Sequence, residues 1–398
     1  MRFYKKIYCR TFQFCFRVAL PFLPYRGPEI LDGMVNIPDV LKKKNIDKVL
    51  VITDKGITNI GLGKKLTNIL EEKNVKYEYF DETVANPTIS NVEAARKKYV
   101  EANCQAIIAL GGGSAMDCAK ATGARVVKPK QSVSKMRGLL KIHKKLPLLF
   151  AIPTTAGTGS ETTLAAVITD DETHHKYPIN DFVLIPRYAV LDYSVTTSLP
   201  KSLTATTGMD ALTHAVEAYI GGSTTKYTRT MSEKAVKLIG ENLKQAYEDG
   251  NNKKARKNML KAAYYAGIAF TQSYVGYVHG VAHSLGGKYG VPHGLANAVI
   301  LPYVLEMYGE SCYKKLAKLG RKAGIITNSD NEIGAKEFIK WIKEMNKSMN
   351  IPTYIEEIQE KDIRKMAKYA DKESNPLYPV PKLMDRKELE EIYRKVKK

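Results

Sequence analysis

The first half of the chain alternates short apolar runs with longer segments whose apolar positions recur at helical spacing. The apolar runs predict strands at residues 48–53, 75–80, 105–110 and 148–153. The segments between them predict helices at residues 61–73, 90–103 and 114–127, and Ser90 with Glu93 is expected to form a capping box. This regular order predicts a doubly wound, parallel α/β sheet whose ligand site lies at the carboxyl ends of the strands.

The pattern changes near Leu199-Pro200, after which strand-like runs almost vanish and amphipathic segments follow one another. These segments predict helices at residues 204–220, 230–248, 253–272, 278–285, 294–309, 311–323, 331–348, 361–372 and 386–397. Ser329 with Glu332 is expected to form a second capping box. We therefore predict an α/β dinucleotide-binding domain at residues 27–200 and an all-helical, metal-binding domain at residues 201–398, with the active site in the cleft between them.

Residues 1–26 form a basic and aromatic arm that contains no acidic residue. The arm lacks the apolar core and cleavage site of a signal peptide, and no apolar run in the chain is long enough to span a bilayer. We expect the arm to pack on the domain or on a partner subunit, and we favour this over an interfacial membrane anchor.

Two glycine-rich turns follow predicted strands in the first half. Gly111-Gly112-Gly113-Ser114 follows one strand, and Thr154 to Glu161 (TTAGTGSE) follows the next. Glycines let the backbone approach a pyrophosphate, and the helix predicted after the first turn offers free N–H groups to it. Asp54, at the end of the first strand, either binds an adenosine ribose, which would favour NAD over NADP, or caps a helix or turn.

Histidines and one aspartate recur at helical spacing in the second half. Asp210 and His214 are four residues apart, as are His279 and His283, while His293 lies beyond the turn-forming run 286–292. A carboxylate with three imidazoles suits Fe(II), Zn(II) or Mn(II), and the remaining imidazole is available for proton transfer near neutral pH. Spacing does not distinguish His279 from His283 as the ligand.

Charge and cysteine content add little to this picture. The 398-residue chain has a formal net charge of +21, but its basic residues are dispersed along the sequence. We therefore expect a lysine-rich solvated surface rather than a nucleic-acid partner, although the positive field would attract a dinucleotide. The five cysteines show no disulfide framework and no CxxC pair, which favours a reducing cytoplasm.

Four motifs together resemble the iron-containing (group III) alcohol dehydrogenase family. They are GGGSAMDCAK (111–120), PTTAGTGSE (153–161), GMDALTHAVEAY (208–219) and HGVAHSLGGKYGVPHG (279–294). The resemblance implies a dehydroquinate synthase-like architecture with an α/β nucleotide domain and a helical metal domain. It also implies a homodimer and a divalent metal, commonly Fe(II) with Zn(II) as the alternative, that polarises an alcohol or aldehyde oxygen beside the nicotinamide.

The resemblance also assigns residues. Its metal ligands fall on Asp210, His214, His279 and His293, and His283 matches the histidine of the proton relay. Its dinucleotide contacts match Gly112, Gly113, Ser114, Asp117, Thr154, Thr155, Thr158 and Lys176, with Asp54 as ribose selector. Residues 1–26 and 28–33 depart from the family's usual short opening strand, which leaves the dimer contact open, and residues 271–277 do not identify an alcohol.

The resulting prediction is reversible hydride transfer between NAD(H) and a primary alcohol or its aldehyde. The metal would act as a Lewis acid on the substrate oxygen, and His283 would carry the alcohol proton outward. A glycerol-type polyol dehydrogenase and a dehydroquinate synthase-like lyase are the alternatives on this fold. The ligand His293 argues against the first, and the lack of basic clusters beside the metal residues argues against the second. A non-catalytic scaffold or membrane-associated protein would have lost the ligands.

Overall fold

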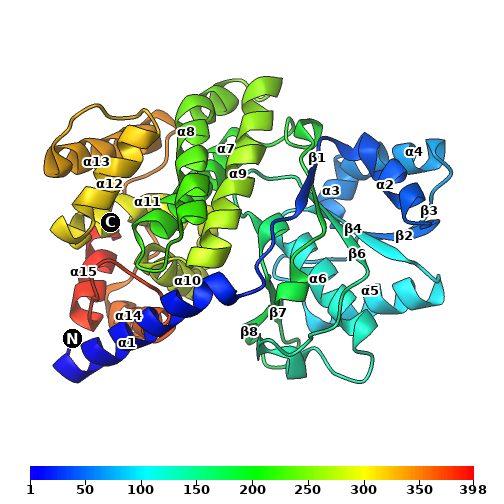
Figure 1. The fold of residues 1–398 in the computed structure, drawn as a ribbon, viewed down its shortest axis with the longest axis horizontal. Helices are drawn as coiled ribbons and strands as arrows, with labels where there is room; N and C mark the ends of the chain where they lie inside the picture. Colours follow the sequence, from blue (N-terminus) through cyan, green and yellow to red (C-terminus); the bar gives the residue numbers. More distant parts are fainter. The chain divides into compact units, whose positions relative to one another are not determined.

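The computed structural model describes residues 1–398, which form two compact units (Figure 1). One unit is Pro24–Ser198, and the other joins Met1–Leu23 to Leu199–Lys398. Residues 1–23 of the basic and aromatic arm therefore fold with the C-terminal helices, whereas its last three residues belong to the α/β unit.

The α/β unit is built on a six-stranded sheet in which every strand pair is parallel. Its strands are β1 (Glu29–Leu31), β2 (Lys48–Ile52), β3 (Lys76–Phe80), β4 (Ala106–Gly111), β6 (Leu148–Pro153) and β9 (Tyr188–Val190), in the spatial order β1-β9-β6-β4-β2-β3. Gly111 at the end of β4 lies in register with Pro153 at the end of β6. The two glycine-rich turns therefore leave neighbouring strands at the same edge, as the sequence predicts.

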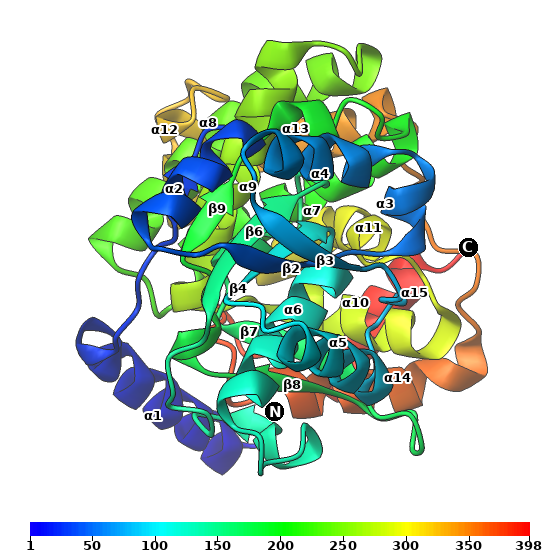
Figure 2. The same cartoon turned by 90° about the vertical axis from the view of Figure 1, so that its right-hand side faces the viewer.

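Alternation along the strands explains why helices cover both faces of this sheet. Val49 and Val51 of β2 share one core with α2 (Ile37–Lys43) and α4 (Leu62–Glu72). Leu50 and Ile52 point to the opposite core. That second core contains residues of α5 (Ile89–Glu101) and α6 (Gly113–Val127). Figure 2 shows the two helix pairs on opposite sides of β2 and β3, which confirms the doubly wound prediction.

Several short elements of this unit have no counterpart in the sequence prediction. They are α2, α3 (Lys55–Asn59), the edge strand β1, its neighbour β9, and a three-stranded sheet of β5 (Gly138–Leu139), β8 (Lys176–Asn180) and β7 (Ala165–Thr169). The predicted capping box at Ser90 is wrong. Helix α5 is capped by Thr88, whose side chain accepts from the Asn91 N–H while the Asn91 side chain accepts from the Thr88 N–H.

The helical unit is arranged around α7 (Lys201–Ile220), in which every residue from Gly208 to Ile220 is buried. Its other helices are α1 (Phe3–Ala19), α8 (Lys226–Glu248), α9 (Lys253–Ser273), α10 (Tyr277–Tyr289), α11 (His293–Tyr308), α12 (Glu310–Lys322), α13 (Asn331–Ser348), α14 (Glu360–Ser374) and α15 (Arg386–Val396). Helix α7 packs against α8, α9, α11 and α12. No helix in the chain combines the length and apolarity that crossing a bilayer requires.

Two local predictions in this unit are corrected. The run 286–292 is not a turn throughout, because α10 continues through Gly286 and Gly287 to Tyr289 and ends at Gly290, which has a left-handed φ of +71°. The capping box at Ser329 is also wrong. Asp330 caps α13 by accepting from the N–H groups of Glu332 and Ile333, since a carboxylate one residue later captures the same free donors.

Candidate metal and dinucleotide sites

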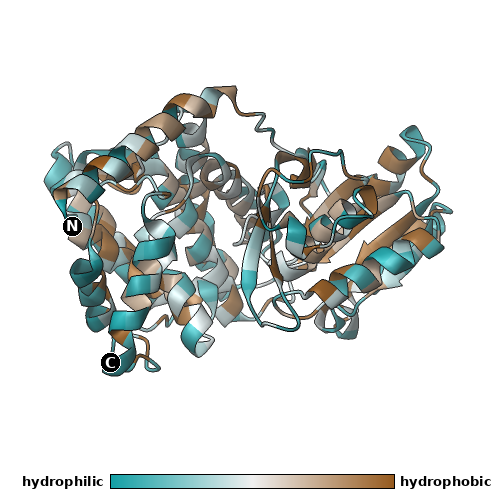
Figure 3. Cartoon of the chain, turned by 90° about the horizontal axis from the view of Figure 1, so that it is seen from below, coloured by the Kyte–Doolittle hydropathy of each residue, from teal (hydrophilic) through white to brown (hydrophobic).

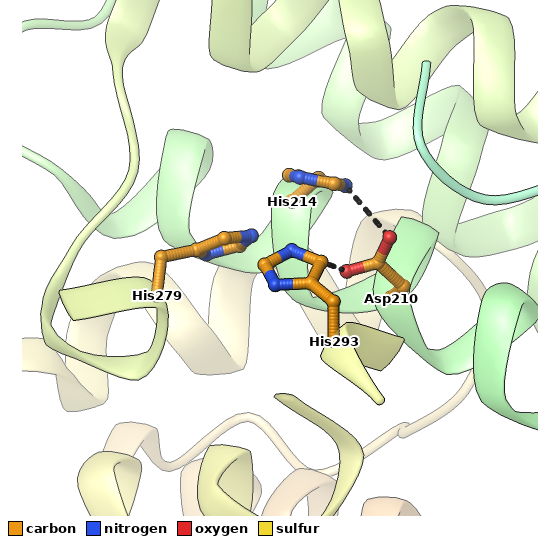
Figure 4. Close-up of side chains that lie close together, drawn as sticks. All are labelled: Asp210, His214, His279 and His293. Carbon is orange, nitrogen blue, oxygen red and sulfur yellow. Dashed lines mark ion pairs between the residues drawn. The ribbon is translucent and has the colours of Figure 1, made fainter. Parts of the chain in front are cut away.

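Three helices bring one carboxylate and three imidazoles together inside the helical unit. Asp210, His214, His279 and His293 each offer one ligand atom, and these atoms all lie within 4.8 Å of one another. Figure 4 shows the four side chains converging, with His293 Nε2 3.5 Å from Asp210 Oδ1 and His214 Nδ1 3.9 Å from Asp210 Oδ2. This donor set and this closeness fit a divalent metal ion.

Close helix packing positions the four side chains. Asp210 and His214 are one turn apart on α7, while His279 comes from α10 and His293 begins α11. Gly294 lets α11 approach α7, because a Cβ at this position would lie 2.6 Å from the Thr206 carbonyl oxygen. The rings of His214 and His279 stack with their centroids 4.5 Å apart.

Glu217 orients His279 from behind. Its Oε2 lies 2.6 Å from His279 Nδ1 and accepts from the Gly276 N–H, while Oε1 accepts from the Val278 N–H. Burial raises the pKa of Glu217 to about 7, although the N–H donors oppose that rise, and burial lowers the pKa of His279. With its Nδ1 proton donated to Glu217, His279 presents the Nε2 lone pair to the cluster, which is the arrangement that a metal ligand requires.

Asn297 lies one turn along α11 from His293 and touches three of the four candidate ligands. Its Nδ2 donates to Asp210 Oδ1 at 2.7 Å and lies 3.2 Å from His279 Nε2 and 3.1 Å from His293 Nε2. An amide N–H facing both Nε2 atoms is consistent with lone pairs on them. Asn297 therefore helps to hold the imidazoles in the state that can bind a metal.

The structure separates His283 from the four clustered residues. Its Nδ1 lies 2.5 Å from Glu373 Oε1, its ring stacks on His293 at 5.2 Å between centroids, and 42% of its side chain is exposed. The Tyr378 hydroxyl donates to the same carboxylate oxygen at 2.7 Å. His283 thus connects the edge of the cluster to the surface.

A separate pocket of about 620 Å³ lies at the carboxyl edge of the sheet in the α/β unit. Its lining includes Asp54, Gly112, Gly113 and Ser114, four of the residues predicted to contact a dinucleotide. Helix α6 begins at this pocket, and its N-cap Gly112 makes no side-chain capping bond. The first N–H groups of α6 therefore lie where a phosphate can accept from them.

Three threonines follow β6 beside these glycines. The Thr154 N–H donates to the Gly111 carbonyl, which ties the second turn to the first. Thr155 Oγ1 lies 4.0 Å from the point where a Cβ on Gly112 would stand, is buried, and has no hydrogen-bond partner in the chain. A dinucleotide fits this observation, since a buried hydroxyl without a partner is costly unless a ligand satisfies it. Thr158 similarly borders Gly113.

Two further predicted cofactor residues make contacts within the protein. Asp117 accepts from the Ser160 hydroxyl and from the Val167 N–H, so its carboxylate joins the second turn to β7. Lys176 donates to Asn86 Oδ1 at 2.6 Å, and the Asn86 N–H donates to the Ser114 hydroxyl of the pocket.

Asp54 acts as a helix cap, which is one of the two roles predicted for it. Its Oδ1 accepts from the Ile57 N–H at 3.0 Å and so caps α3. The same residue lines the pocket together with Asp81 and Glu82. Lys55 also lines this pocket, so its charged lining residues carry both signs.

Glu217, Asn297, Glu373 and Lys120 are absent from the sequence prediction. Glu217 had a usable signal, because it lies seven residues after Asp210 and so shares a face of α7 with both candidate ligands. Lys120 is fully buried and donates to the carbonyl oxygens of Ser160, Thr163 and Ala165 and to the hydroxyls of Ser160 and Thr163. It therefore fixes the turn after β6.

Comparison with known proteins gives matches that span both units. The family model described as Iron-containing alcohol dehydrogenase matches residues 32–193, and the model described as Fe-containing alcohol dehydrogenase family, C-terminal, matches residues 204–397. Alcohol dehydrogenase 4 of Saccharomyces cerevisiae is 40% identical over 334 residues, covering 83% of this chain and 86% of that protein. The 1,3-propanediol dehydrogenase of Citrobacter freundii is 37% identical over 385 residues, covering 95% of this chain and 98% of that protein. The solved structure of alcohol dehydrogenase from Oenococcus oeni has a TM-score of 0.88 at 32% identity, covering 94% of this chain and all of that one.

Proposed function

The chain belongs to the iron-containing alcohol dehydrogenase family and is a metal-dependent alcohol dehydrogenase, and from this premise we propose that it transfers hydride reversibly between NAD(H) and a small primary alcohol or its aldehyde. The observation that carries the proposal is the convergence of Asp210, His214, His279 and His293.

These four residues would hold the metal, which we propose to be Fe(II), with Zn(II) as an alternative that suits the same donors. When bound, the ion supplies Lewis acidity that makes an alcohol oxygen easier to deprotonate. Glu217 keeps the Nε2 lone pair of His279 aimed at the ion by accepting the Nδ1 proton. The chain itself contributes preorganised ligands, so little rearrangement is required on binding.

We propose that the pocket beside Gly112 and Gly113 holds the dinucleotide, with its phosphates at the start of α6. The nicotinamide supplies the hydride chemistry, and the protein supplies orientation. Asp54, Asp81 and Glu82 support a preference for NAD(H), because the 2′-phosphate of NADP(H) would add negative charge beside three carboxylates.

His283 is proposed to carry the alcohol proton to solvent. It stacks on His293, pairs with Glu373 and reaches the surface, so a proton accepted near the cluster has a short path outward. For the substrate, we propose short primary alcohols and diols, which is consistent with the propanediol dehydrogenase among the relatives.

We further propose a cytoplasmic homodimer. Five free cysteines are consistent with a reducing compartment. Strand β1 pairs on one side only and ends the six-stranded sheet, so its other edge is available to a second copy. Light scattering in solution would measure the mass of the assembly.

The reaction is tested by anaerobic oxidation of NADH, and separately of NADPH, by protein reconstituted with Fe(II) or Zn(II). The aldehyde panel should run from acetaldehyde to butyraldehyde and include 3-hydroxypropionaldehyde. We expect metal-dependent oxidation of NADH with at least one short aldehyde. If no aldehyde of the panel is reduced although metal is shown to be bound, the result would instead favour the polyol dehydrogenase or lyase alternatives.

A matched pair of variants links the reaction to the site. His279→Ala should lose bound metal and activity together, because it removes a ligand, whereas His175→Ala, which changes a histidine of the α/β unit, should lose neither. Metal and activity both retained in His279→Ala would refute the assignment of the ligands.

A further inference from the structure

One side of helix α1 packs on the protein through two polar side chains and a buried cysteine. Lys5 pairs with Asp371 at 2.8 Å, and the Gln13 amide donates to the Tyr378 carbonyl at 2.7 Å. Cys9 lies between them in sequence and is fully buried. These residues follow one another at four-residue spacing, so they form one stripe along the helix, and this stripe is the side that packs on the rest of the helical unit.

The opposite side of α1 carries large hydrophobic residues that remain exposed. We call these residues the outer face of α1: Phe3, Tyr4, Ile7, Tyr8, Phe14 and Val18. Phe3 is 78% exposed and Phe14 is 65% exposed, and Phe22, just after the helix, is 84% exposed. Figure 3 shows hydrophobic positions recurring along this helix. The protein side of α1 also holds Phe16, whose ring meets the Tyr274 ring edge-on at 5.0 Å between centroids, whereas the aromatic residues of the outer face lie in solvent.

Basic residues border the outer face. At about 100° per residue, Lys6 and Arg17 fall together along one side of it. Arg10 falls on the same side, but its guanidinium donates to the carbonyl oxygens of Val380 and Pro381 and so holds α1 to the helical unit. No acidic residue occurs before Glu29. The charge of Arg17 also acts on Lys315. Burial lowers the pKa of Lys315 to about 8, and the positive charges of Arg17 and Arg229 contribute to this lowering. The partner of this face should therefore be apolar in part and negatively charged.

We propose that the outer face of α1 docks the enzyme on an anionic lipid bilayer surface. Aromatic and aliphatic side chains would enter the boundary between headgroups and acyl chains, while the basic border would bind anionic headgroups. Contact is peripheral, since no helix of the chain can cross a membrane.

A second copy of the chain suits this face less well than a lipid surface. Two outer faces packed together would bring their basic borders close with no acidic residue from either helix between them. The overall charge of +21 adds to that repulsion, whereas the same charge favours approach to an anionic surface.

The test uses full-length protein, because deleting α1 would also remove contacts that Lys5 and Gln13 make with the helical unit. Purified protein is sedimented with vesicles of phosphatidylcholine and phosphatidylglycerol in equal amounts, and with vesicles of phosphatidylcholine only. We expect binding to the anionic vesicles, weakened by salt, and little binding to the neutral ones.

Two sets of substitutions separate the contributions of apolar contact and charge. The combined change Ile7→Ser, Phe14→Ser and Val18→Ser should abolish measurable binding, whereas Ile333→Ser, an equally exposed isoleucine on α13, should not. Lys6→Gln with Arg17→Gln should weaken binding about 25-fold, at roughly fivefold for each charge. Lys42→Gln with Lys43→Gln removes two charges on α2 and should have a much smaller effect.

Activity toward a soluble aldehyde and thermal unfolding should be unchanged in the outer-face variants, because the altered side chains are exposed. Failure of the wild-type protein to bind anionic vesicles would overturn the proposal. Equal binding by the triple serine variant would also overturn it. A wild-type mass that falls when the three serines are introduced, measured by light scattering without lipid, would show that a second copy covers this face instead.

Discussion

Replacing Glu217 with glutamine should weaken metal binding even though no ligand is changed. The carboxylate accepts from three N–H groups: Oε1 from Val278, and Oε2 from Gly276 and from His279 Nδ1. Glutamine has one oxygen and one amide nitrogen in their place. In one orientation the amide N–H₂ faces Gly276 and His279. In the other it faces Val278, so a donor meets a donor in either case.

The two orientations have different costs. If the glutamine oxygen stays with Val278, His279 must accept at Nδ1 and carry its proton on Nε2, the atom that faces Asn297 and the other ligands. If the oxygen stays with His279, the buried Val278 N–H is left unpaired at a cost of about 1–3 kcal/mol, and His279 loses a charge-assisted bond. Loss of such a partner typically lowers metal affinity about 10- to 100-fold, or ~1.4–2.7 kcal/mol.

Metal affinity is best measured by competition against a chelator of known affinity, which does not depend on turnover. Glu233→Gln is the matched control, because Glu233 of α8 likewise accepts a hydrogen bond from a neighbouring helix, from the Tyr219 hydroxyl of α7, but lies outside the cluster. Unchanged metal affinity together with an unchanged denaturant midpoint in Glu217→Gln would refute the claim that Glu217 orients His279.

Three further predictions concern the proton path, the cofactor and the turn after β6. His283→Ala should retain metal but lower kcat by about 10²-fold or more and alter its pH profile, measured with saturating aldehyde; an unaltered profile would exclude a relay role. Asp54→Asn keeps a capping side chain but removes the charge, so it should raise the NADPH-to-NADH ratio of kcat/KM by about tenfold, and Asp54→Gly should do the same with lower stability. If the NADPH-to-NADH ratio of kcat/KM is unchanged in both variants, Asp54 only caps α3 and does not select the cofactor. Lys120→Met should destabilise the fold by about 3–5 kcal/mol in urea unfolding, because it leaves three backbone carbonyls without their donor, whereas Lys64→Met on the surface of α4 should change little.

The strands and helices that could be predicted are those whose pattern is set locally. Strand β2 alternates between two apolar cores, and α13 has the bounds that its periodicity predicts. Strands β1 and β9 are three residues each, which is too short to show a pattern that a single sequence can distinguish from a loop. The Ser90 and Ser329 capping boxes failed because the helices begin at other residues: Thr88 caps α5 two residues earlier, and Asp330 caps α13 one residue later.

The candidate ligands were predictable from two signals in the sequence. Histidine and aspartate are residue types that bind metals, and they occur here at helical spacing. The residues that orient them were not predictable in the same way. Glu373 approaches His283 through a contact between helices that are 90 residues apart in sequence. Glu217 and Asn297 are the exceptions, since each lies at helical spacing from a candidate ligand on its own helix, Glu217 on α7 and Asn297 four residues after His293 on α11.

The sequence of α7 has little amphipathic pattern because the helix is buried on all sides from Gly208 to Ile220. A helix surrounded on all sides normally carries apolar residues all round, yet α7 buries Asp210, His214 and Glu217 on one stripe. Asp210 and Glu217 would be costly if they lacked polar partners, and both have them: Asn297 for Asp210, and two backbone N–H groups with His279 for Glu217. The polar stripe is therefore tolerated because α10 and α11 deliver complementary groups to it, so the packing that completes the fold also assembles the ligands. A substitution that loosens α11 against α7, such as one at Gly294, should for this reason impair metal binding and stability together.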